Sequence, residues 1–194
     1  MELKDAVYGR RSVRKYLDKP VPRELIQEIL ESACMAPSGI NRQPWYFLTI
    51  TDPELREKYL GYTKETFVRF RPTLEKRFSR NPEVVEETGT FFTTLGGAPV
   101  VILVFLLNDE LKESDNEITL IQGIGAAIQN LLLAAYDKGL ACCWTTAPIA
   151  SGLAEQIRAD FAPDKGDLMA AVTLGYPDQS PKAPPRRPGR FDIV

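Results

Sequence analysis

The sequence predicts an α+β fold in which a mixed sheet of four or five strands is flanked by helices. Aromatic, β-branched or continuously apolar runs of strand length recur along the chain. The longer segments between them carry apolar residues at helical spacing. No internal repeat or linker divides the 194 residues, so we expect residues 1–194 to form a single domain with a full core.

The chain is expected to begin with two helices and a strand. Residues 2–8 have a short helical pattern that Gly9 ends. Residues 22–36 start with a proline at a favourable helical position and continue as an amphipathic helix. Residues 45–51 are aromatic and β-branched and lie between two prolines, which predicts a strand.

The middle of the chain predicts helices around one buried strand. Residues 54–96 are charged and helical in pattern, with interruptions expected near Pro72 and Pro82. Residues 99–105 form a continuous apolar run, typical of a strand that is buried on both faces. Residues 117–138 form the longest helical pattern and are apolar nearly all round, so this helix should be central.

The last third is expected to alternate strand, helix and strand, at residues 140–145, 153–161 and 168–174. The tail that follows is rich in Pro and Arg and ends in the strand-like segment 191–194. Such a tail cannot build its own core, so it must lie on another surface. Small residues in the 117–138 helix would let a helix of a second copy approach closely, and we expect an obligate dimer.

Composition excludes several classes of function. The chain has no histidine, which excludes the usual serine and cysteine triads. Its three cysteines have a spacing that fits no zinc finger or ribbon, so we expect reduced thiols and no metal site. The longest apolar run, 98–107, is far shorter than the roughly 20 residues that cross a bilayer, and the N-terminus lacks a signal peptide's apolar core. We expect a cytoplasmic protein with no membrane segment.

Basic residues crowd both ends of a chain whose net charge is only −2. If the ends meet in space, they form one basic pocket; otherwise they are two solvated tails or a nucleic-acid patch. We expect no nucleic-acid binding, because the basic segments lack interleaved aromatic residues and no reading helix is evident.

Two motifs near the N-terminus carry the functional prediction. The first, residues 10–14, places three guanidiniums and a hydroxyl within five residues, and these donors are suited to a phosphate. In the second, residues 37–45, the side-chain amides of Asn41 and Gln43 offer both donors and acceptors, the set needed to hydrogen-bond the edge of a planar heterocycle. Alone, the first motif is more often a solvated basic segment, and Ser38-Gly39 could simply end a helix.

Together these motifs resemble the flavin contacts of the nitroreductase family. The residues similar to its N-terminal phosphate and ring-edge motif are Arg10, Arg11, Ser12 and Arg14. Those similar to the segment that meets the flavin of the partner subunit are Pro37, Ser38, Gly39, Asn41 and Gln43. The loop similar to the one that approaches the flavin ring contains Thr146, Ala147, Pro148 and Ile149. The late pair similar to the second phosphate contact is Arg186 and Arg187.

The resemblance implies an FMN-dependent NAD(P)H oxidoreductase that acts as a homodimer, with the C-terminal tail exchanged onto the partner. It would reduce nitroaromatics, quinones or a similar small, flat acceptor by a ping-pong mechanism. Because the chain has few reactive groups of its own, we expect no catalytic side chain and assign the redox chemistry to the cofactor. We expect Arg10, Arg14 and Arg187 to converge on the FMN phosphate.

Two departures keep alternatives open. Many family members carry a Lys or Arg just before the strand that begins here at Pro99, but none occurs between Arg80 and Lys112. The 145–148 loop resembles the family's dehalogenating branch, which has Thr where this chain has Ala147. The alternatives are a reductive dehalogenase, a flavin-cleaving enzyme, and a non-catalytic flavin-binding or redox-sensing protein.

Overall fold

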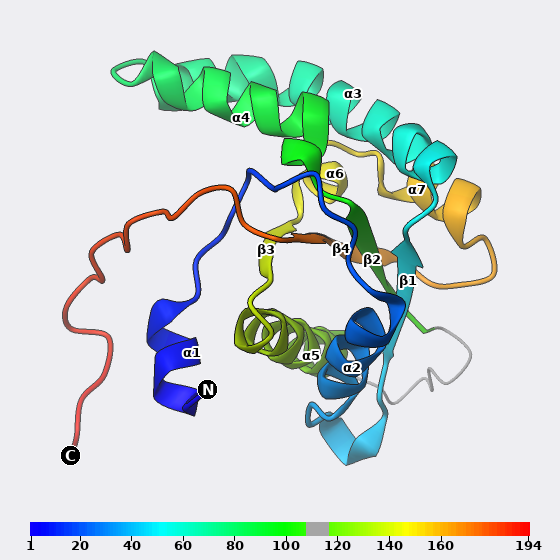
Figure 1. The fold of residues 1–194 in the computed structure, drawn as a ribbon, viewed down its shortest axis with the longest axis vertical. Coiled ribbons are helices and arrows are strands. Elements are labelled where there is room, and N and C mark those ends of the chain that lie inside the picture. The colour runs from blue at the N-terminus through cyan, green and yellow to red at the C-terminus, as the bar shows by residue number, and fades with distance from the viewer. Residues whose placement is uncertain (108–116) are drawn as a thin grey trace.

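A four-stranded sheet separates two layers of helices in the computed structural model, which describes residues 1–107 and 117–194 (Figure 1). The strand order is β1-β2-β4-β3, within the four or five strands expected. The bounds are β1 Trp45–Ile50, β2 Val100–Leu106, β3 Ala141–Thr145 and β4 Leu168–Gly175. The strands expected at 45–51, 99–105, 140–145 and 168–174 are confirmed, each within about two residues of its predicted ends, whereas the strand-like segment 191–194 forms no strand.

The pairing differs from the mixed sheet that we expected. β1 pairs with β2, β2 with β4, and β4 with β3, and all three pairings are antiparallel. The parallel contact found among the described residues is the isolated bridge between Ser12 and Cys142. β2 and β3 do run parallel, but β4 lies between them. The apolar patterns predict where strands occur and not which strands become neighbours.

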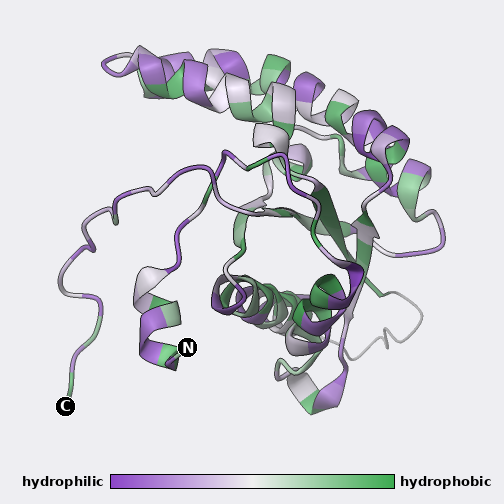
Figure 2. Ribbon diagram, viewed as in Figure 1, coloured by the Kyte–Doolittle hydropathy of each residue, from purple (hydrophilic) through white to green (hydrophobic). Residues whose placement is uncertain are grey.

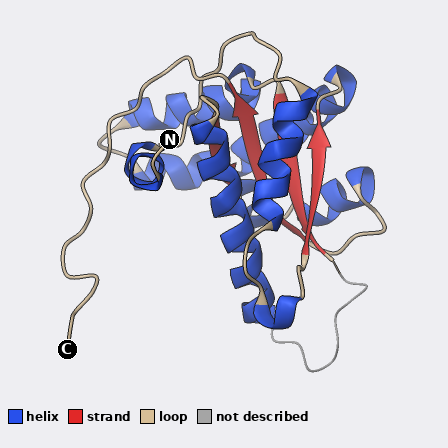
Figure 3. Ribbon diagram, turned by 60° about the horizontal axis from the view of Figure 1, so that its bottom comes forward, coloured by secondary structure: helices blue, strands red, loops and turns tan. Residues whose placement is uncertain are grey.

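The helices lie on both faces of the sheet (Figure 3). Their bounds are α1 Leu3–Gly9, α2 Arg23–Cys34, α3 Pro53–Arg77, α4 Pro82–Thr94, α5 Glu117–Asp137, α6 Ala147–Ala150 and α7 Ala154–Phe161. Two short 3₁₀ turns add η1 Gly39–Asn41 and η2 Leu95–Gly97. α2 and α5 share one core with the sheet, whereas α3 and α7 share the core on the other face.

β2 contributes to both cores, as the continuous apolar run predicted. Its alternate residues Val100, Ile102 and Val104 pack on the α2–α5 side. Val101 and Leu103 pack on the α3–α7 side, and both are fully buried. Because successive side chains of a strand point to opposite faces, an unbroken apolar run is what a strand between two helical layers requires.

The expected interruption near Pro72 is wrong, whereas the one near Pro82 is confirmed. α3 continues through Pro72 to Arg77, and Pro82 is the first residue of α4. A proline inside a helix removes the hydrogen bond to the carbonyl four residues earlier. Here that residue is Val68, which is 70% exposed, so water can solvate the carbonyl.

α5 is the central helix that its apolar sequence predicted. It is long and apolar enough to cross a membrane by length and composition, but the core helix of a globular protein passes the same test. Ile124, Ile128 and Leu131 on α5 are buried against the rest of the domain, and the hydrophobic colouring of Figure 2 runs from this helix into the sheet. These contacts make α5 a core helix.

The C-terminal tail leaves the domain after β4 and runs extended to Val194 (Figure 1). Phe191 and Ile193 are 84% and 94% exposed. The expected dependence of the tail on another surface therefore stays a prediction.

Candidate functional site

A cavity of about 1060 Å³ lies between the α3–α4 hairpin, the end of β3 and the N-terminal segment. The N-terminal segment contributes Arg14, Lys15 and Tyr16. α3 and its C-terminal end contribute Phe70 and Phe78, and α4 contributes residues that include Glu87, Thr88 and Phe91. The floor is formed by Cys143, Trp144, Thr145, Thr146 and Ala147. Aromatic walls with a few polar groups are typical of a pocket for a planar ligand.

The N-terminal segment that carries Arg14 is held in place by backbone contacts. The N–H of Val13 donates to the carbonyl of Cys142 at 3.0 Å, and the N–H of Tyr16 donates to the carbonyl of Gly96 at 2.8 Å. Gly96 has φ of 63°, and a Cβ there would lie 2.0 Å from the Arg14 carbonyl oxygen. Only glycine allows η2 and the segment to approach so closely.

Tyr16 anchors the same segment from below. Its buried hydroxyl donates to the Val13 carbonyl at 2.7 Å and lies 2.8 Å from Thr173 Oγ1 on β4. Burial raises the pKa of Tyr16 well above the ordinary value, so the phenol stays neutral. Arg14 is thereby fixed at the cavity by its neighbours in sequence, and its own N–H donates to Gln179 Oε1 at 2.9 Å.

The structure separates Arg10 from Arg14. Burial raises the pKa of Cys142, and the nearby Arg10 guanidinium offsets part of that rise. Burial also raises the pKa of Cys143, which the Arg14 guanidinium offsets in the same way. The two cysteines are adjacent on β3 and belong to cores on opposite faces of the sheet. Arg14 therefore lines the cavity, whereas Arg10 lies beside the other face of β3.

Arg11 and Ser12 differ from Arg10 and Arg14 in what they contact. The Arg11 guanidinium donates to the backbone carbonyls of Tyr8 and Arg10, both at 2.7 Å, and lines a smaller cavity of about 460 Å³. Ser12 is exposed and forms the backbone bridge to β3. Arg11 thus braces the end of α1 in this structure.

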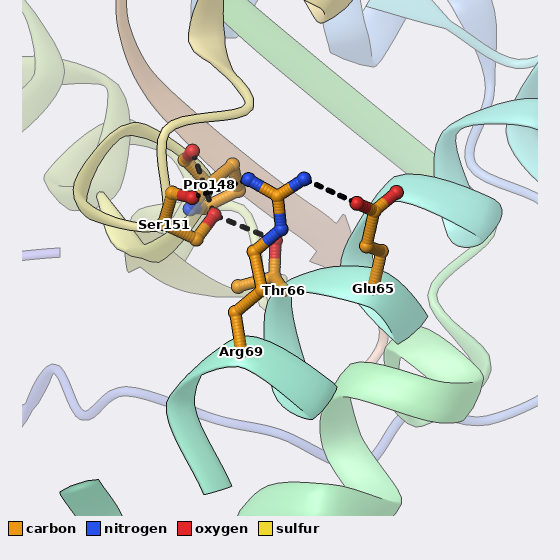
Figure 4. A network of polar contacts seen from close by, with 5 residues as sticks. All are labelled: Glu65, Thr66, Arg69, Pro148 and Ser151. Carbon is orange, nitrogen blue, oxygen red and sulfur yellow. Dashed lines mark hydrogen bonds and ion pairs between the residues drawn. The ribbon is translucent and has the colours of Figure 1, made fainter.

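A polar network on α3 holds the loop that contains Thr146 to Ile149 (Figure 4). Ser151 Oγ donates to the Pro148 carbonyl at 2.9 Å and lies 3.3 Å from Thr66 Oγ1, which is fully buried. Arg69 donates to the Ser151 carbonyl at 2.8 Å and also pairs with Glu65. This network fixes the loop against the cavity, where Thr146 and Ala147 form part of the lining.

The Pro37 to Gln43 segment lies away from this cavity, beside the first half of α5. A Cβ on Gly39 would meet Thr119 Cγ2 at 2.6 Å, and Ser38 Oγ accepts from the Gln43 N–H at 2.8 Å. Asn41 and Gln43 have positive φ of 58° and 48° and are exposed, and they border a separate cavity of about 660 Å³. Within one chain, the two halves of the predicted site are not brought together.

The late arginines, Arg186 and Arg187, are exposed on the tail and make no ion pair or hydrogen bond with the described residues. The expected convergence of Arg187 with Arg10 and Arg14 stays a prediction, and it would require a second copy or a movement of the tail.

The α3–α4 wall and Trp144 are the parts of the site that the sequence did not predict. Trp144 is 39% exposed and lines the cavity. Glu87, Thr88 and Phe91 lie on one face of α4, because residues three and four apart are neighbours on a helix. That spacing was visible in the sequence, but only the fold shows which way the face points.

Comparisons with known proteins give a consistent result. Residues 7–176 match the model of the nitroreductase family. A Methanothermobacter thermautotrophicus protein named "Putative NADH dehydrogenase/NAD(P)H nitroreductase" is 30% identical over 182 residues, which cover 93% of this chain and 80% of the relative. Iodotyrosine deiodinase 1 of Rattus norvegicus is 27% identical over 202 residues, which cover 100% of this chain and 68% of the relative. A Desulfovibrio desulfuricans protein named "putative nitroreductase", whose crystal structure is in complex with FMN, is 28% identical and has a TM-score of 0.74. The match covers 100% of this chain and 98% of that chain.

Proposed function

The chain belongs to the nitroreductase family, and from that premise we propose that it is an FMN-dependent oxidoreductase that takes hydride from NADH or NADPH. Its acceptor is a nitroaromatic, a quinone or a similar flat molecule, reduced by a ping-pong mechanism. The single observation that carries the proposal is the cavity of about 1060 Å³, lined by aromatic rings and by Arg14. The similar D. desulfuricans structure in complex with FMN and the nitroreductase name of the archaeal relative support it.

The residues of this chain fit a flavin. Arg10 Nε is buried and has no hydrogen-bond partner among the described residues, as expected of a donor that awaits an external acceptor. A phosphate is a suitable acceptor for such a guanidinium. Arg14, on the other side of β3, has access to the cavity and suits the edge of the ring. FMN, when bound, supplies the hydride transfer that no side chain here can perform.

The protein's part in the reaction is binding and orientation. Arg14 would hold a positive charge beside the bound ring. The 146–149 loop, fixed by Ser151 and Arg69, would support the ring from β3. Reduction of a nitro group to a nitroso group consumes two electrons and two protons and releases water. One NAD(P)H supplies both electrons and one proton as hydride, and solvent supplies the other proton.

A second copy of the chain would complete this site. Pro37 to Gln43 lies apart from the cavity of its own chain, and Ile40 in its centre is 84% exposed. α1 exposes Leu3 and Tyr8, at 71% and 72%, and Gly125 on α5 has open space around it. Exposed apolar residues in neighbouring elements favour an interface. We propose a homodimer in which the 37–43 segment of each copy covers the cofactor of the other.

The test follows the flavin absorbance of purified protein under anaerobic conditions. We expect NADH or NADPH to bleach the bound flavin and a nitroaromatic or quinone to restore its colour. Parallel double-reciprocal plots would identify a ping-pong mechanism. A protein that binds FMN but is reduced by neither nucleotide would be a flavin-binding protein instead, and a protein that binds no FMN would exclude the whole proposal.

Iodotyrosine as the acceptor tests the second candidate, a reductive dehalogenase. The similarity to rat iodotyrosine deiodinase favours it. Ala147 opposes it, since the dehalogenating branch carries a threonine at the matching position. We expect little iodide release, and rapid release would make dehalogenation the leading function.

A further inference from the structure

The wall that α4 contributes to the cavity offers hydrogen-bond acceptors but no free side-chain donor. Thr88 Oγ1 donates to the Val84 carbonyl at 2.6 Å. Thr90 Oγ1 donates to the Glu86 carbonyl at 3.0 Å, and Thr94 Oγ1 donates to the Thr90 carbonyl at 2.6 Å. Each hydroxyl proton is engaged within the helix, so Thr88 and Thr90 can serve a ligand in the cavity only as acceptors, and Thr94 Oγ1 also accepts from the Gly96 N–H at 3.1 Å.

Glu87 adds an unpaired negative charge to this wall. It lines the cavity and makes no ion pair with any described residue. The adjacent Glu86 differs, because it lies 3.7 Å from Arg71 and does not line the cavity. No Lys or Arg occurs between Arg80 and Lys112, so α4 carries no cation of its own. A carboxylate in this position favours a cationic ligand over an anionic one.

Aromatic rings stand around the same space. Phe70 and Phe78 come from the α3 side, Phe91 from α4 and Trp144 from β3. The face of an aromatic ring attracts a cation, and it also stacks on a flat ligand. The rings thus suit a ligand that is both planar and positively charged.

The positive charges of the cavity lie at its other side, on the N-terminal segment. Arg14 lies beside Cys143 on β3, where the proposed function places the cofactor ring. Lys15 pairs with Asp178 at 3.2 Å. The cavity is therefore polarised, with its cationic side at β3 and its acceptor-lined side at α4.

We propose that the acceptor reduced here is a flat aromatic molecule that carries a cationic amino group. The ammonium lies at Glu87 and the aromatic rings, and the reducible group lies toward Thr146 and Ala147. This specificity rests on the proposed function, since it assumes that the cofactor ring takes the Arg14 side. Acceptors with a carboxylate are disfavoured by the same wall.

Three acceptors with the same reducible group test the proposal. They are para-nitrobenzyltrimethylammonium, para-nitrobenzyl alcohol and para-nitrobenzoate, which are cationic, neutral and anionic. We expect the kcat/KM of the cation to exceed that of the alcohol about fivefold, the upper range for an exposed ion pair. The benzoate should be the poorest of the three. Added salt should reduce the preference, because it screens exposed charges.

A matched pair of variants separates binding charge from the reduction potentials of the acceptors. Glu87→Gln should abolish most of the preference for the cation over the alcohol, a fall of about fivefold in that ratio. Glu86→Gln removes the same charge one residue away and should leave the ratio unchanged. A preference that survives Glu87→Gln, or that is absent from the unmodified protein, overturns the proposal.

Failure of the proposed function would give a different result. If no nitro compound is reduced, binding of benzyltrimethylammonium, which cannot be reduced, is measured by calorimetry. Binding that is weakened about fivefold in Glu87→Gln and not in Glu86→Gln still supports a cation site. Equal binding by both variants, or no binding by the unmodified protein, overturns it.

Discussion

Arg10 and Arg14 are close in the sequence, yet the edge of β3 separates the environments of their side chains. The Arg10 guanidinium offsets part of the burial-raised pKa of Cys142, and the Arg14 guanidinium does the same for Cys143. The side chains of these two neighbouring cysteines lie on opposite faces of β3. A motif that suggests one cluster of donors in the sequence therefore becomes two separate guanidiniums, of which Arg14 lines the cavity.

Arg10→Ala should weaken FMN binding by roughly ten- to a hundredfold, because a charge-assisted hydrogen bond contributes on the order of 1.5–3 kcal/mol. The reason is the buried, unpaired Arg10 Nε. Fluorescence titration of the apoprotein with FMN measures the effect. Arg80→Ala, which removes an equal charge from the exposed turn between α3 and α4, is the control. Equal affinities for the two variants would remove Arg10 from the site.

Tyr59 is a second residue whose polar atom is buried without a partner. Its hydroxyl has none among the described residues, and its side chain is 1% exposed. Burial raises the pKa of Tyr59. A raised folded-state pKa gives stability that is fully present below the unfolded value of about 10 and is lost as the pH rises through the folded value.

Tyr59→Phe should therefore increase the free energy of unfolding by up to about 1 kcal/mol at pH near 7, and should move alkaline unfolding to higher pH.

Tyr62→Phe is the contrasting variant. Tyr62 donates to Asp160 at 2.7 Å, and burial together with this carboxylate raises the pKa of Tyr62 to about 12. Its loss should destabilise the protein slightly at neutral pH. Urea unfolding of both variants at neutral and alkaline pH decides, and a destabilised Tyr59→Phe would contradict the argument.

At the scale of elements, the α3–α4 hairpin determines both the shape of the cavity and the position of Arg14. α4 ends at Thr94 with Leu95 as its C-cap, which has a positive φ of 52°, and η2 then carries the chain to the N-terminal segment, where the Gly96 carbonyl accepts from the Tyr16 N–H. α3 holds the 146–149 loop through Thr66 and Arg69. The two helices of residues 54–96 thus form a wall of the cavity and hold the 146–149 loop against it.

Gly96→Ala should lower the free energy of unfolding by about 2–3 kcal/mol, through left-handed strain and overpacking together. The added Cβ would meet the Arg14 carbonyl oxygen at 2.0 Å, and backbone cannot rotate away as a side chain can. FMN affinity should fall as well, because Arg14 moves. Gly61→Ala is the matched control: this α3 glycine has nothing within 4 Å, so the same change should stabilise α3 by about 0.5–1 kcal/mol. Chemical denaturation measures both, and a neutral Gly96→Ala would refute the close approach.

At the scale of the whole molecule, two parts of the predicted site lie apart in one chain, and the tail packs on no surface that the described residues form. The large cavity lies at the α3–α4 hairpin, whereas the Pro37 to Gln43 segment lies beside α5, and the tail extends away from the domain (Figures 1 and 3). Association of two copies would place complementary halves together and would cover the exposed apolar residues of α1 and the tail.

Deletion of residues 184–194 should cost both dimer stability and bound FMN. The deleted segment contains Arg186 and Arg187 as well as the exposed Phe191 and Ile193. Light scattering gives the oligomeric state, and flavin absorbance gives the cofactor content. The double variant Arg186→Ala/Arg187→Ala separates the two effects, because it should weaken FMN binding and leave the dimer intact. A truncated protein that stays dimeric and yellow would exclude a role for the tail.

The sequence by itself determined where most of the elements lie and which family the chain resembles. Apolar periodicity is a local property, so it located all four strands and the helices around 22–36 and 117–138. The prediction of a break at Pro72 was wrong, because whether a proline interrupts a helix depends on what solvates the carbonyl that loses its hydrogen bond. The clustered arginines and the amide-rich turn carried the family resemblance, since they lie within short segments.

Only the tertiary structure decided what lies beside what. The antiparallel pairing, the separation of Arg10 from Arg14, and the exposure of Trp144 all depend on which elements become neighbours. So does the Glu87 wall, whose residues look like an ordinary solvated helix face until α3 and β3 enclose them. The physical reason is that periodicity records which face of an element is apolar, whereas a site is made by contacts between residues far apart in the chain.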